Sequence, residues 1–280
     1  MGSAAGSRGA RRSRRSLPSG NGPSAGPCYR RDVDHAAVRD APERRLHAPI
    51  ETPENGPLRA QWLGRMPYRA AWALQKELAA ARADDRVGDR LLLVEHEAVL
   101  TLGRHADEGH VLASAEVLAA RGVELIRVER GGEVTYHGPG QLVAYPILAL
   151  SRRGLMLRPL VRALEAAMIE TCAALGVDAW RRDGHPGCWV GDAEAPRKIG
   201  ALGIRVERGV SYHGVALNID PDLRDFDLIE ACGMPGVVST SIAAELGRRG
   251  EAPSADRVRA AAETFARAFA TRIGAPLELR

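Results

Sequence analysis

Apolar residues recur at helical spacing in several stretches of the chain beyond about Gln61. The clearest stripe runs through seven positions from Leu157 to Leu175 and is followed by Gly176, a residue typical of helix C-termini. The same spacing predicts further helices, which are 68–83, 113–121, a segment capped by the serines at 239 and 241 and running to Gly247, and a last helix through Val258 and Phe269.

Short apolar runs bounded by charged residues or glycine predict strands at 91–95, 123–128 and 141–150, the last expected to end or bulge at Pro146. Two further runs, 198–206 and 210–219, flank Glu207-Arg208-Gly209 and predict a β-hairpin. Because helices and strands do not alternate regularly, the order of elements favours an α+β fold over a regular βαβ array.

The first 57 residues show no apolar periodicity and are rich in Gly, Ser, Pro and Arg. We therefore expect a disordered basic extension over 1–57 and a single domain over 58–280. No apolar segment follows the arginines, which excludes a secretory signal, while a transit peptide and a misplaced start codon stay open as alternatives. The chain holds no run of about 18 apolar residues, so we expect no membrane span.

The net charge differs between these two parts. The 280-residue chain has a formal charge of +4, but seven of its 39 basic residues lie within 1–31, which contain no acid. The remainder carries 32 basic and 35 acidic residues and is nearly neutral. An apolar fraction of 45% is enough to bury a core. The near-neutral body gives no support for nucleic-acid binding.

The four cysteines, at 28, 172, 188 and 232, show no zinc or disulfide spacing. Free thiols in a reducing compartment, and hence a cytoplasmic location, are expected. Cys172 lies on the apolar stripe of the helix beginning at Leu157, which favours a core position. Cys188 follows His185 at an expected strand start, but no second pair completes a metal site, so we expect no bound metal.

The densest candidate for chemistry is the segment RGGEVTYHGPGQ, residues 130–141, between two predicted strands. Adjacent glycines allow a backbone to approach a ligand closely and to present N–H groups to it. Arg130 could hold an anionic group, and Tyr136 and His137 could flank a substrate. An ordinary glycine-rich turn is the alternative, and the segment is no G-x-x-x-x-G-K-[ST] phosphate loop.

A second candidate is Cys232, within the loop sequence ACGMPG that precedes a capped helix. A helix N-terminus or a nearby ammonium lowers the pKa of a thiol and so provides a thiolate nucleophile. Lys198 is one of only two lysines, and lysine, unlike arginine, can give up its proton. Lys198 and His137 are comparable candidates to activate Cys232, and His213 repeats the Tyr-His-Gly triplet of His137.

Three sequence segments match the motifs of one known family in their order and spacing. They are RGGEVTYHGPGQLVAYPIL (130–148), KIGALGIRVERGVSYHGVALNI (198–219) and the CG–P–G–STS stretch at 232–241, with a weaker match at Leu102-Gly103-Arg104. Together they resemble the lipoyl(octanoyl) transferases, over roughly residues 60–275. Two departures are Glu133, where the family often has Gln, and Gly200, where Ala or Ser is common.

The resemblance implies a mixed β-sheet flanked by helices, as in the catalytic domain of lipoate and biotin protein ligases. It implies a catalytic pair formed by Cys232 and Lys198. It also implies an acyl site lined by Arg130, Gly131, Gly132, Glu133, Val134, Thr135, Tyr136 and His137 together with Ala201, Leu202, Gly203, Gly214, Val215 and Ala216.

The reaction implied by the resemblance moves an octanoyl group through a thioester on Cys232 to a lysine amine. The expected donor is octanoyl-acyl carrier protein. The expected acceptors are lipoyl domains of 2-oxoacid dehydrogenase E2 subunits and the glycine cleavage H protein. A thioester is already activated, so ping-pong kinetics without ATP or another cofactor are expected, with no nucleic-acid or membrane partner.

Three other functions remain open at this point. A lipoate or biotin ligase would activate a free acid with ATP, although the sequence continues as His-Gly-Pro-Gly-Gln rather than the His-Asp common in lipoate ligases. A cysteine hydrolase would pair Cys232 with His137 or His213 and release free octanoate. A non-catalytic acyl-binding module would leave Cys232 unmodified.

Overall fold

A computed structural model describes residues 56–234, 236–247 and 254–280, without the side chain of Cys232. The described residues all belong to one unit, Pro49–Arg280. The extension expected over 1–57 lies outside the described residues, apart from Gly56 and Pro57.

Strands and helices take the following places along the described chain. The strands are β1 Leu58–Met66, β2 Arg90–His96, β3 Val99–Leu102, β4 Glu124–Arg127, β5 Val134–His137, β6 Gln141–Ile147, β7 Ala179–Arg182, β8 His185–Val190, β9 Arg197–Glu207, β10 Val210–Asn218, β11 Val238–Ser239 and β12 Leu277–Leu279. The helices are α1 Tyr68–Ala83, α2 Ala115–Ala120, α3 Leu157–Ala174, α4 Ile242–Glu245 and α5 Ala255–Arg272. Short 3₁₀ turns are η1 Glu108–His110, η2 Ser151–Arg153, η3 Leu223–Leu228 and η4 Ala231–Gly233.

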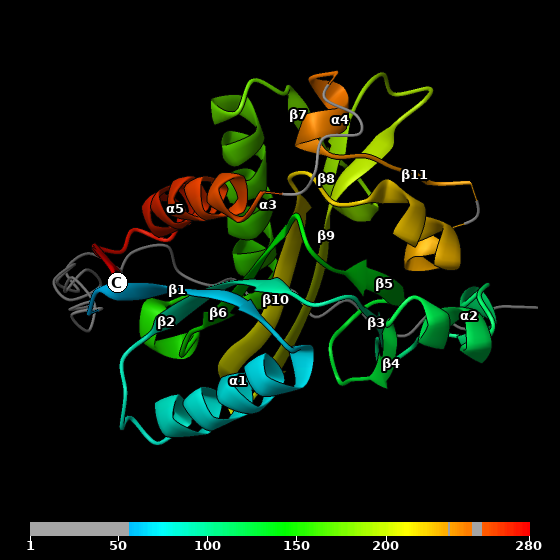
Figure 1. Cartoon of the computed structure of the whole chain (residues 1–280). Helices are drawn as coiled ribbons and strands as arrows, with labels where there is room; N and C mark the ends of the chain where they lie inside the picture. The colour runs from blue at the N-terminus through cyan, green and yellow to red at the C-terminus, as the bar shows by residue number, and fades with distance from the viewer. Residues whose placement is uncertain (1–55, 235, 248–253) are drawn as a thin grey trace, which may run out of the picture. The chain divides into compact units, whose positions relative to one another are not determined.

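A large mixed sheet lies at the centre of the fold (Figure 1). Its strand order is β12-β1-β2-β6-β10-β9-β8-β7, with β11 paired to β9. β1 runs parallel to β2 and β12, and the strands from β2 through β6, β10, β9 and β8 to β7 are successively antiparallel. A smaller sheet has the order β4-β3-β5. The expected α+β class, a mixed sheet flanked by helices, is confirmed.

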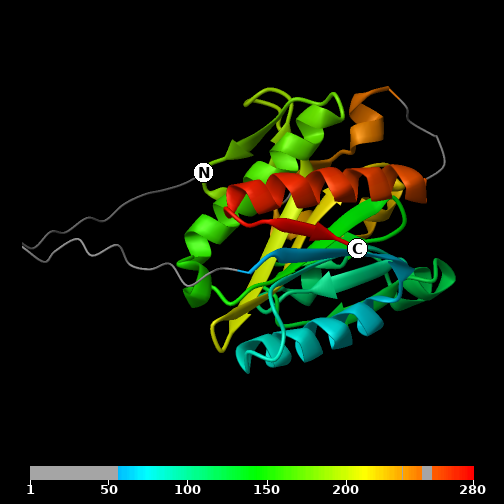
Figure 2. The same cartoon turned by 90° about the vertical axis from the view of Figure 1, so that its left-hand side faces the viewer.

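The helices cover both faces of the large sheet (Figures 1 and 2). α3 and α5 pack on one face, where Leu164, Met168, Phe265 and Phe269 are fully buried in the main apolar cluster. α1 covers the other face, with Ala71 in a second cluster against β2 and β6. Burial of these apolar faces supplies the driving force that holds the layers together.

Three of the predicted helices illustrate how local signals set their ends. α1 has the predicted bounds, and α4 begins where the Ser241 hydroxyl accepts a 3.1 Å hydrogen bond from the Ala244 N–H. α2 is shorter than the expected 113–121. Ser114 is its N-cap, and Gly122 leaves the helical conformation with a φ of 64°.

The expected hairpin is confirmed in β9 and β10. Arg208 and Gly209 join them with φ values of 49° and 77°, the left-handed conformation that two-residue hairpin turns use. β6 ends at Ile147, earlier than expected. Pro146 still pairs with β2, but the ladder to β10 stops at Ala144, because proline has no N–H to donate.

Other boundaries differ from the sequence prediction. The first strand, β1, begins at Leu58, ahead of the apolar periodicity that starts near Gln61, and the pattern gives no indication of β1, β5, β7, β11 or β12. Cys188 lies inside β8, which begins at His185, and not at a strand start. Among the described residues, no helix is long and apolar enough to cross a membrane.

Candidate functional site

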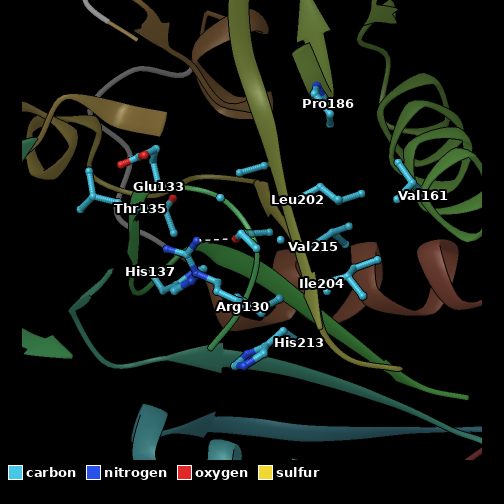
Figure 3. Close-up of a pocket in the computed structure, with 18 of the residues that line it drawn as sticks. Arg130, Glu133, Thr135, His137, Val161, Pro186, Leu202, Ile204, His213 and Val215 are labelled. Carbon is cyan, nitrogen blue, oxygen red and sulfur yellow. Dashed lines mark hydrogen bonds between the residues drawn. The ribbon is translucent and has the colours of Figure 1, made fainter. Parts of the chain in front are cut away.

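A cavity of about 420 Å³ lies where the β9–β10 hairpin faces the turn before β5 (Figure 3). This volume is within the range of small-molecule sites. The wall between its two ends is largely apolar, with Leu202 and Ile204 from β9, Val215 from β10 and Val161 from α3. Polar side chains lie at the two ends, in the turn before β5 and at Thr135 on β5 itself.

The glycine loop, residues 129–133, forms one wall of the cavity against β9. The Gly131 N–H donates a 3.1 Å hydrogen bond to the Ile204 carbonyl. A Cβ atom on Gly203 would lie 2.6 Å from the Gly131 carbonyl oxygen, so glycine is required for this approach. Because β9 already engages the Gly131 N–H, that group does not serve as an oxyanion donor.

Arg130 anchors the glycine loop to β3. Arg130 is 7% exposed, and its guanidinium donates to the Thr101 hydroxyl from Nε and Nη2, at 3.2 and 2.9 Å. Nη2 also donates to the Thr101 carbonyl at 2.6 Å, and Nη1 to the Gly131 carbonyl at 3.0 Å. The side chain lines the cavity, but these bonds assign it to holding the loop rather than to receiving an anionic group.

Lys198 faces one end of the cavity from β9. It is 7% exposed, and its register partners are Trp189 on β8 and Ser239 on β11. The ammonium lies 5.1 Å from the centroid of the Trp189 ring, a cation–π distance. A Cβ atom on Gly187 would lie 3.1 Å from Lys198 Cε, so β8 encloses the stem of the lysine.

The backbone of Cys232 lies in η4, close to the same end of the cavity. Met234, two residues further on, lines the cavity together with Lys198. The Glu230 N–H donates a 2.8 Å hydrogen bond to the His110 carbonyl, which fixes the start of η4.

An acidic and imidazole pair packs against η4. Glu133 Oε2 and His110 Nδ1 are 3.2 Å apart, and a Cβ atom on Gly233 would lie 3.0 Å from both side chains. Glu133 also accepts a 3.1 Å hydrogen bond from the Asp107 N–H. The glycine loop and η4 are thereby held side by side.

The turn between β7 and β8 covers the Lys198 end of the cavity with Gly184, His185 and Pro186. A buried carboxylate on α3 holds this turn in place. Glu165 Oε1 accepts a 3.1 Å hydrogen bond from the Gly187 N–H, and Oε2 accepts a 2.7 Å bond from Arg181 Nε.

The opposite end of the cavity carries buried aromatic and imidazole rings. Tyr68 stacks on His137 with ring centroids 5.9 Å apart, and His137 Nδ1 lies 2.7 Å from Gln141 Oε1. Burial lowers the pKa of His137 to about 3, so its ring is neutral at pH 7. Such a ring is a poor general base.

His213 completes this opposite end from β10. The residue is 1% exposed, is among those that line the cavity and has a φ of 55°. Burial lowers the pKa of His213, so this ring too is neutral at pH 7. Pro186 and His213 mark the two ends in Figure 3, with Leu202, Val215 and Ile204 between them.

The structure brings thirteen of the fourteen residues expected to line the acyl site to the cavity wall, together with Lys198. Tyr136 is the exception. Because side chains alternate along β5, Tyr136 points away from the cavity and donates a 2.7 Å hydrogen bond to Asp225 Oδ2. Its ring packs against Phe226, so Tyr136 has a structural role.

Several lining residues were not indicated by the sequence. Leu157 and Val161 belong to the apolar stripe of α3, which by itself predicts only a core face. Tyr145 and Val143 come from β6, whose continuous apolar pattern shows burial but not the cavity. The Gly-His-Pro-Gly sequence at the start of β8 is typical of a turn and gives no indication of the cavity.

Within the described part of the chain, no group of three or more His, Cys, Asp or Glu side chains could hold a metal ion. His185 instead packs its ring against Trp189, with centroids 6.3 Å apart. Cys172 and Cys188 are buried, with their sulfur atoms 4.0 Å apart, which confirms the core position expected for Cys172.

Residues 67–266 match the family model of the lipoyl protein ligase A/B catalytic domain. An octanoyltransferase from Chloroflexus aurantiacus is 49% identical over 192 residues, covering 68% of this chain and 85% of the relative. One from Acidobacterium capsulatum is 45% identical over 216 residues, covering 74% and 88%. One from Paraburkholderia phytofirmans is 40% identical over 236 residues, covering 82% and 91%.

Solved structures with a similar fold include a bipartite lipoate protein ligase from Thermoplasma acidophilum, with a TM-score of 0.55 at 16% identity over 80% of this chain and 86% of that chain. A lipoate-protein ligase A bound with ATP gives 0.55 at 17% identity, covering 80% and 87%. At these identities the likeness concerns the fold, and the expected likeness to lipoate ligases is confirmed.

Proposed function

This chain belongs to the octanoyltransferases of the lipoyl protein ligase A/B catalytic-domain family, and we propose that Cys232 and Lys198 carry its transfer reaction. Membership makes the chain an acyltransferase of protein lipoylation, with lipoyl-domain proteins as its acceptors. The proposed donor is octanoyl-acyl carrier protein. The proposed acceptors are lipoyl domains of 2-oxoacid dehydrogenase E2 subunits and the glycine cleavage H protein.

One observation carries the proposal. Lys198 and the residues next to Cys232 meet at one end of a largely apolar cavity. The glycine loop forms one side wall of this cavity. An apolar cavity suits an eight-carbon chain, and an ammonium at its end suits a thiolate and a thioester carbonyl.

The first half of the reaction acylates the enzyme. The Cys232 thiolate attacks the thioester carbonyl of the donor, and the tetrahedral intermediate collapses with loss of the carrier thiolate. Lys198, present as an ammonium, stabilises the attacking thiolate and then gives its proton to the departing carrier sulfur. An octanoyl thioester on Cys232, a neutral Lys198 amine and a carrier thiol result.

The second half transfers the acyl group to the acceptor. The neutral ε-amino group of the acceptor lysine attacks the Cys232 thioester, and its surplus proton passes to the Lys198 amine. Cys232 leaves as a thiolate and an amide forms, so both residues return to their starting state. No ATP enters either half, because the donor thioester is already activated.

One of the alternatives meets a specific obstacle in the cavity. His137 and His213 lie at the end opposite Lys198 and are neutral at pH 7, which disfavours a cysteine hydrolase based on either ring. A ligase would depend on ATP, and a binding module would leave the thiol unmodified.

A transfer assay separates these possibilities. We expect octanoyl transfer from octanoyl-acyl carrier protein to a lipoyl domain in ATP-free buffer, and a loss of at least 10³-fold for Cys232→Ala. Cys28→Ser, outside the described residues, is the matched thiol control and should transfer at the wild-type rate. Transfer that requires ATP would favour the ligase, and release of octanoate without an acceptor would favour the hydrolase.

A further inference from the structure

A second space, the outer hollow, borders η4 and β11 and has a volume of about 650 Å³. Ala231 and Met234, which lie on either side of Cys232 in sequence, both line it, and Met234 also lines the cavity that holds the proposed acyl site. Thr240 lines the outer hollow as well, and its N–H donates a 2.9 Å hydrogen bond to the Lys198 carbonyl. The segment that carries Cys232 therefore borders two spaces, and both adjoin the strand of Lys198.

Apolar side chains form much of the wall of the outer hollow, and they are Leu112, Leu223, Phe226, Ile229, Val237 and Val238. Two of them are left open to solvent, since Leu112 is 58% exposed and Val238 is 56% exposed. Apolar side chains that are gathered in one concave place and left exposed are typical of a binding surface. We therefore expect a ligand with an apolar part to cover Leu112 and Val238.

The polar groups of the outer hollow favour a neutral ligand that carries amides. Two arginines and two carboxylates balance in formal charge along its wall, and they are Arg197, Arg224, Asp227 and Glu230. Among the described strands, β11 pairs with β9 alone, which leaves one edge of Val238–Ser239 with backbone groups that no strand satisfies. An extended chain with amide groups can pair with such an edge.

The chemistry of acyl transfer requires space on two sides of the reacting carbon. This inference rests on the proposed function, in which the Cys232 thiolate attacks the thioester of the donor. The thioester carbon carries the acyl chain on one side and the sulfur of the carrier on the other. Because the acyl chain occupies the apolar cavity, the sulfur and the arm attached to it need a separate place that also borders Cys232.

We propose that the outer hollow binds the pantetheine arm on which the carrier protein holds the thioester. Pantetheine is a neutral, extended chain with two amides and a branched dimethyl carbon. The amides suit the open edge of β11, and the dimethyl carbon suits the apolar wall at Leu112 and Val238. The outer hollow is thus a site for the leaving group of the first half-reaction, distinct from the site of the acyl chain.

Two small thioesters isolate the arm from the rest of the carrier protein. S-octanoyl-pantetheine and S-octanoyl-N-acetylcysteamine have the same acyl chain and the same thioester, but the second compound lacks the outer half of the arm. The rate constant for acylation of Cys232 by each is measured by intact mass in ATP-free buffer. The ratio of the two rate constants is the readout, because a change in the reactivity of Cys232 affects both donors equally.

The wild-type chain should react faster with the pantetheine thioester, by about tenfold or more. Val238→Glu and Leu112→Glu each place a carboxylate in the apolar wall and should lower the ratio to about threefold or less. Val117→Glu is the matched control, because Val117 is 43% exposed on α2 and lines neither space. Its ratio should equal that of the wild type. A wild-type ratio below about threefold, or one ratio shared by all four proteins, would overturn the proposal.

Further measurements separate this proposal from other failures. Thermal unfolding checks that the variants fold, and if neither hollow variant folds, the wild-type ratio decides alone. Binding of free pantetheine, measured by calorimetry, tests the outer hollow without any transfer, and Val238→Glu should weaken it by about tenfold. Equal binding by both proteins would overturn the proposal. An unmodified Cys232 with either donor would reject the transfer mechanism, whereas the calorimetry would still decide on the hollow.

The acceptor lysine is the rival occupant of the outer hollow. A Val238→Glu chain that keeps the wild-type ratio of acylation rates, but passes its octanoyl group to a lipoyl domain more slowly than Val117→Glu does, would assign the hollow to the acceptor and overturn the proposal.

Discussion

Lys198 of β9 and Ser239 of β11 are register partners in a parallel strand pair, and the adjacent Thr240 N–H donates a 2.9 Å hydrogen bond to the Lys198 carbonyl. The segment that follows η4 is thereby joined to the strand that carries Lys198. Cys232 and Lys198 are 34 positions apart in sequence, and this pairing brings a segment that follows Cys232 to the strand that carries Lys198.

The proposed proton relay predicts that charge alone is insufficient at position 198. Lys198→Arg keeps a cation on β9, but arginine stays protonated and cannot alternate between acid and base. We expect octanoyl transfer to fall by about 10²–10⁴-fold. Lys76→Arg is the matched control, because Lys76 is the chain's other lysine and is exposed over the Trp72 ring. Transfer by Lys198→Arg at the rate of this control would contradict the relay.

The close packing of Gly103 against the glycine loop can be tested by a substitution that leaves Cys232 and Lys198 unchanged. A Cβ atom on Gly103 would overlap the Gly132 carbonyl oxygen and lie 2.9 Å from Arg130 Nη1, so Gly103→Ala must displace the loop. Overpacking of this kind costs about 1–3 kcal/mol. We expect urea unfolding to report such a loss, together with slower transfer. Gly88→Ala meets no atom within 4 Å and should change neither quantity, and equal behaviour of the two variants would refute the steric account.

The buried carboxylate of Glu165 predicts a loss of support for the β8 turn. Glu165→Ala leaves the Gly187 N–H without its acceptor and should lower the free energy of unfolding by about 1–3 kcal/mol. Transfer should also slow, because this turn covers the Lys198 end of the cavity. Glu170→Ala on the same helix removes an ion pair with Arg272 at the surface and should cost under about 1 kcal/mol. A Glu165→Ala chain as stable as Glu170→Ala would show that the carboxylate does not hold the turn.

The buried histidines predict a stability that falls in mild acid. Burial lowers the pKa of His96 to about 4 and that of His137 to about 3, whereas both rings titrate near 6.5 when unfolded. Below pH 6.5 these rings become protonated in the unfolded chain but stay neutral in the folded chain. The free energy of unfolding therefore decreases as the pH falls. Each ring contributes a slope of up to about 1.4 kcal/mol per pH unit.

Urea unfolding between pH 7.5 and 5.0 measures this slope. His137→Asn keeps an amide that can donate to Gln141 but does not titrate. The change in its free energy of unfolding per pH unit should therefore be smaller than that of the wild type by the contribution of one proton, up to about 1.4 kcal/mol. An unchanged slope would show that the pKa of His137 is not lowered in the folded chain.

Local patterns were sufficient for the elements whose signals lie within one segment. The alanine-rich periodicity of α1, the stripe of α3 and the Arg208-Gly209 turn are each determined by neighbours in sequence. β1, by contrast, contains charged and polar residues at irregular positions and becomes a strand through its pairing with β2 and β12. That pairing is set by tertiary contacts, which override a weak local preference.

The candidate site likewise contains residues that the sequence indicates and residues that only the fold brings together. The glycine loop and the lysine strand are continuous motifs, and their sequences identified one end and the apolar middle of the cavity. The histidine end is assembled from α1, β5, β6 and β10, so no single segment reveals it. The positive φ of His213 and the outward direction of Tyr136 depend on neighbouring strands and are not visible in sequence.

The most direct test of the central claim is the intact mass of the chain after incubation with octanoyl-acyl carrier protein in ATP-free buffer. The account predicts a gain of one octanoyl group on the wild type, its loss when a lipoyl domain is added, and no thioester adduct on Cys232→Ser. An unmodified wild-type chain that still transfers octanoyl, or an adduct that Cys232→Ser carries equally and the lipoyl domain does not remove, would contradict it.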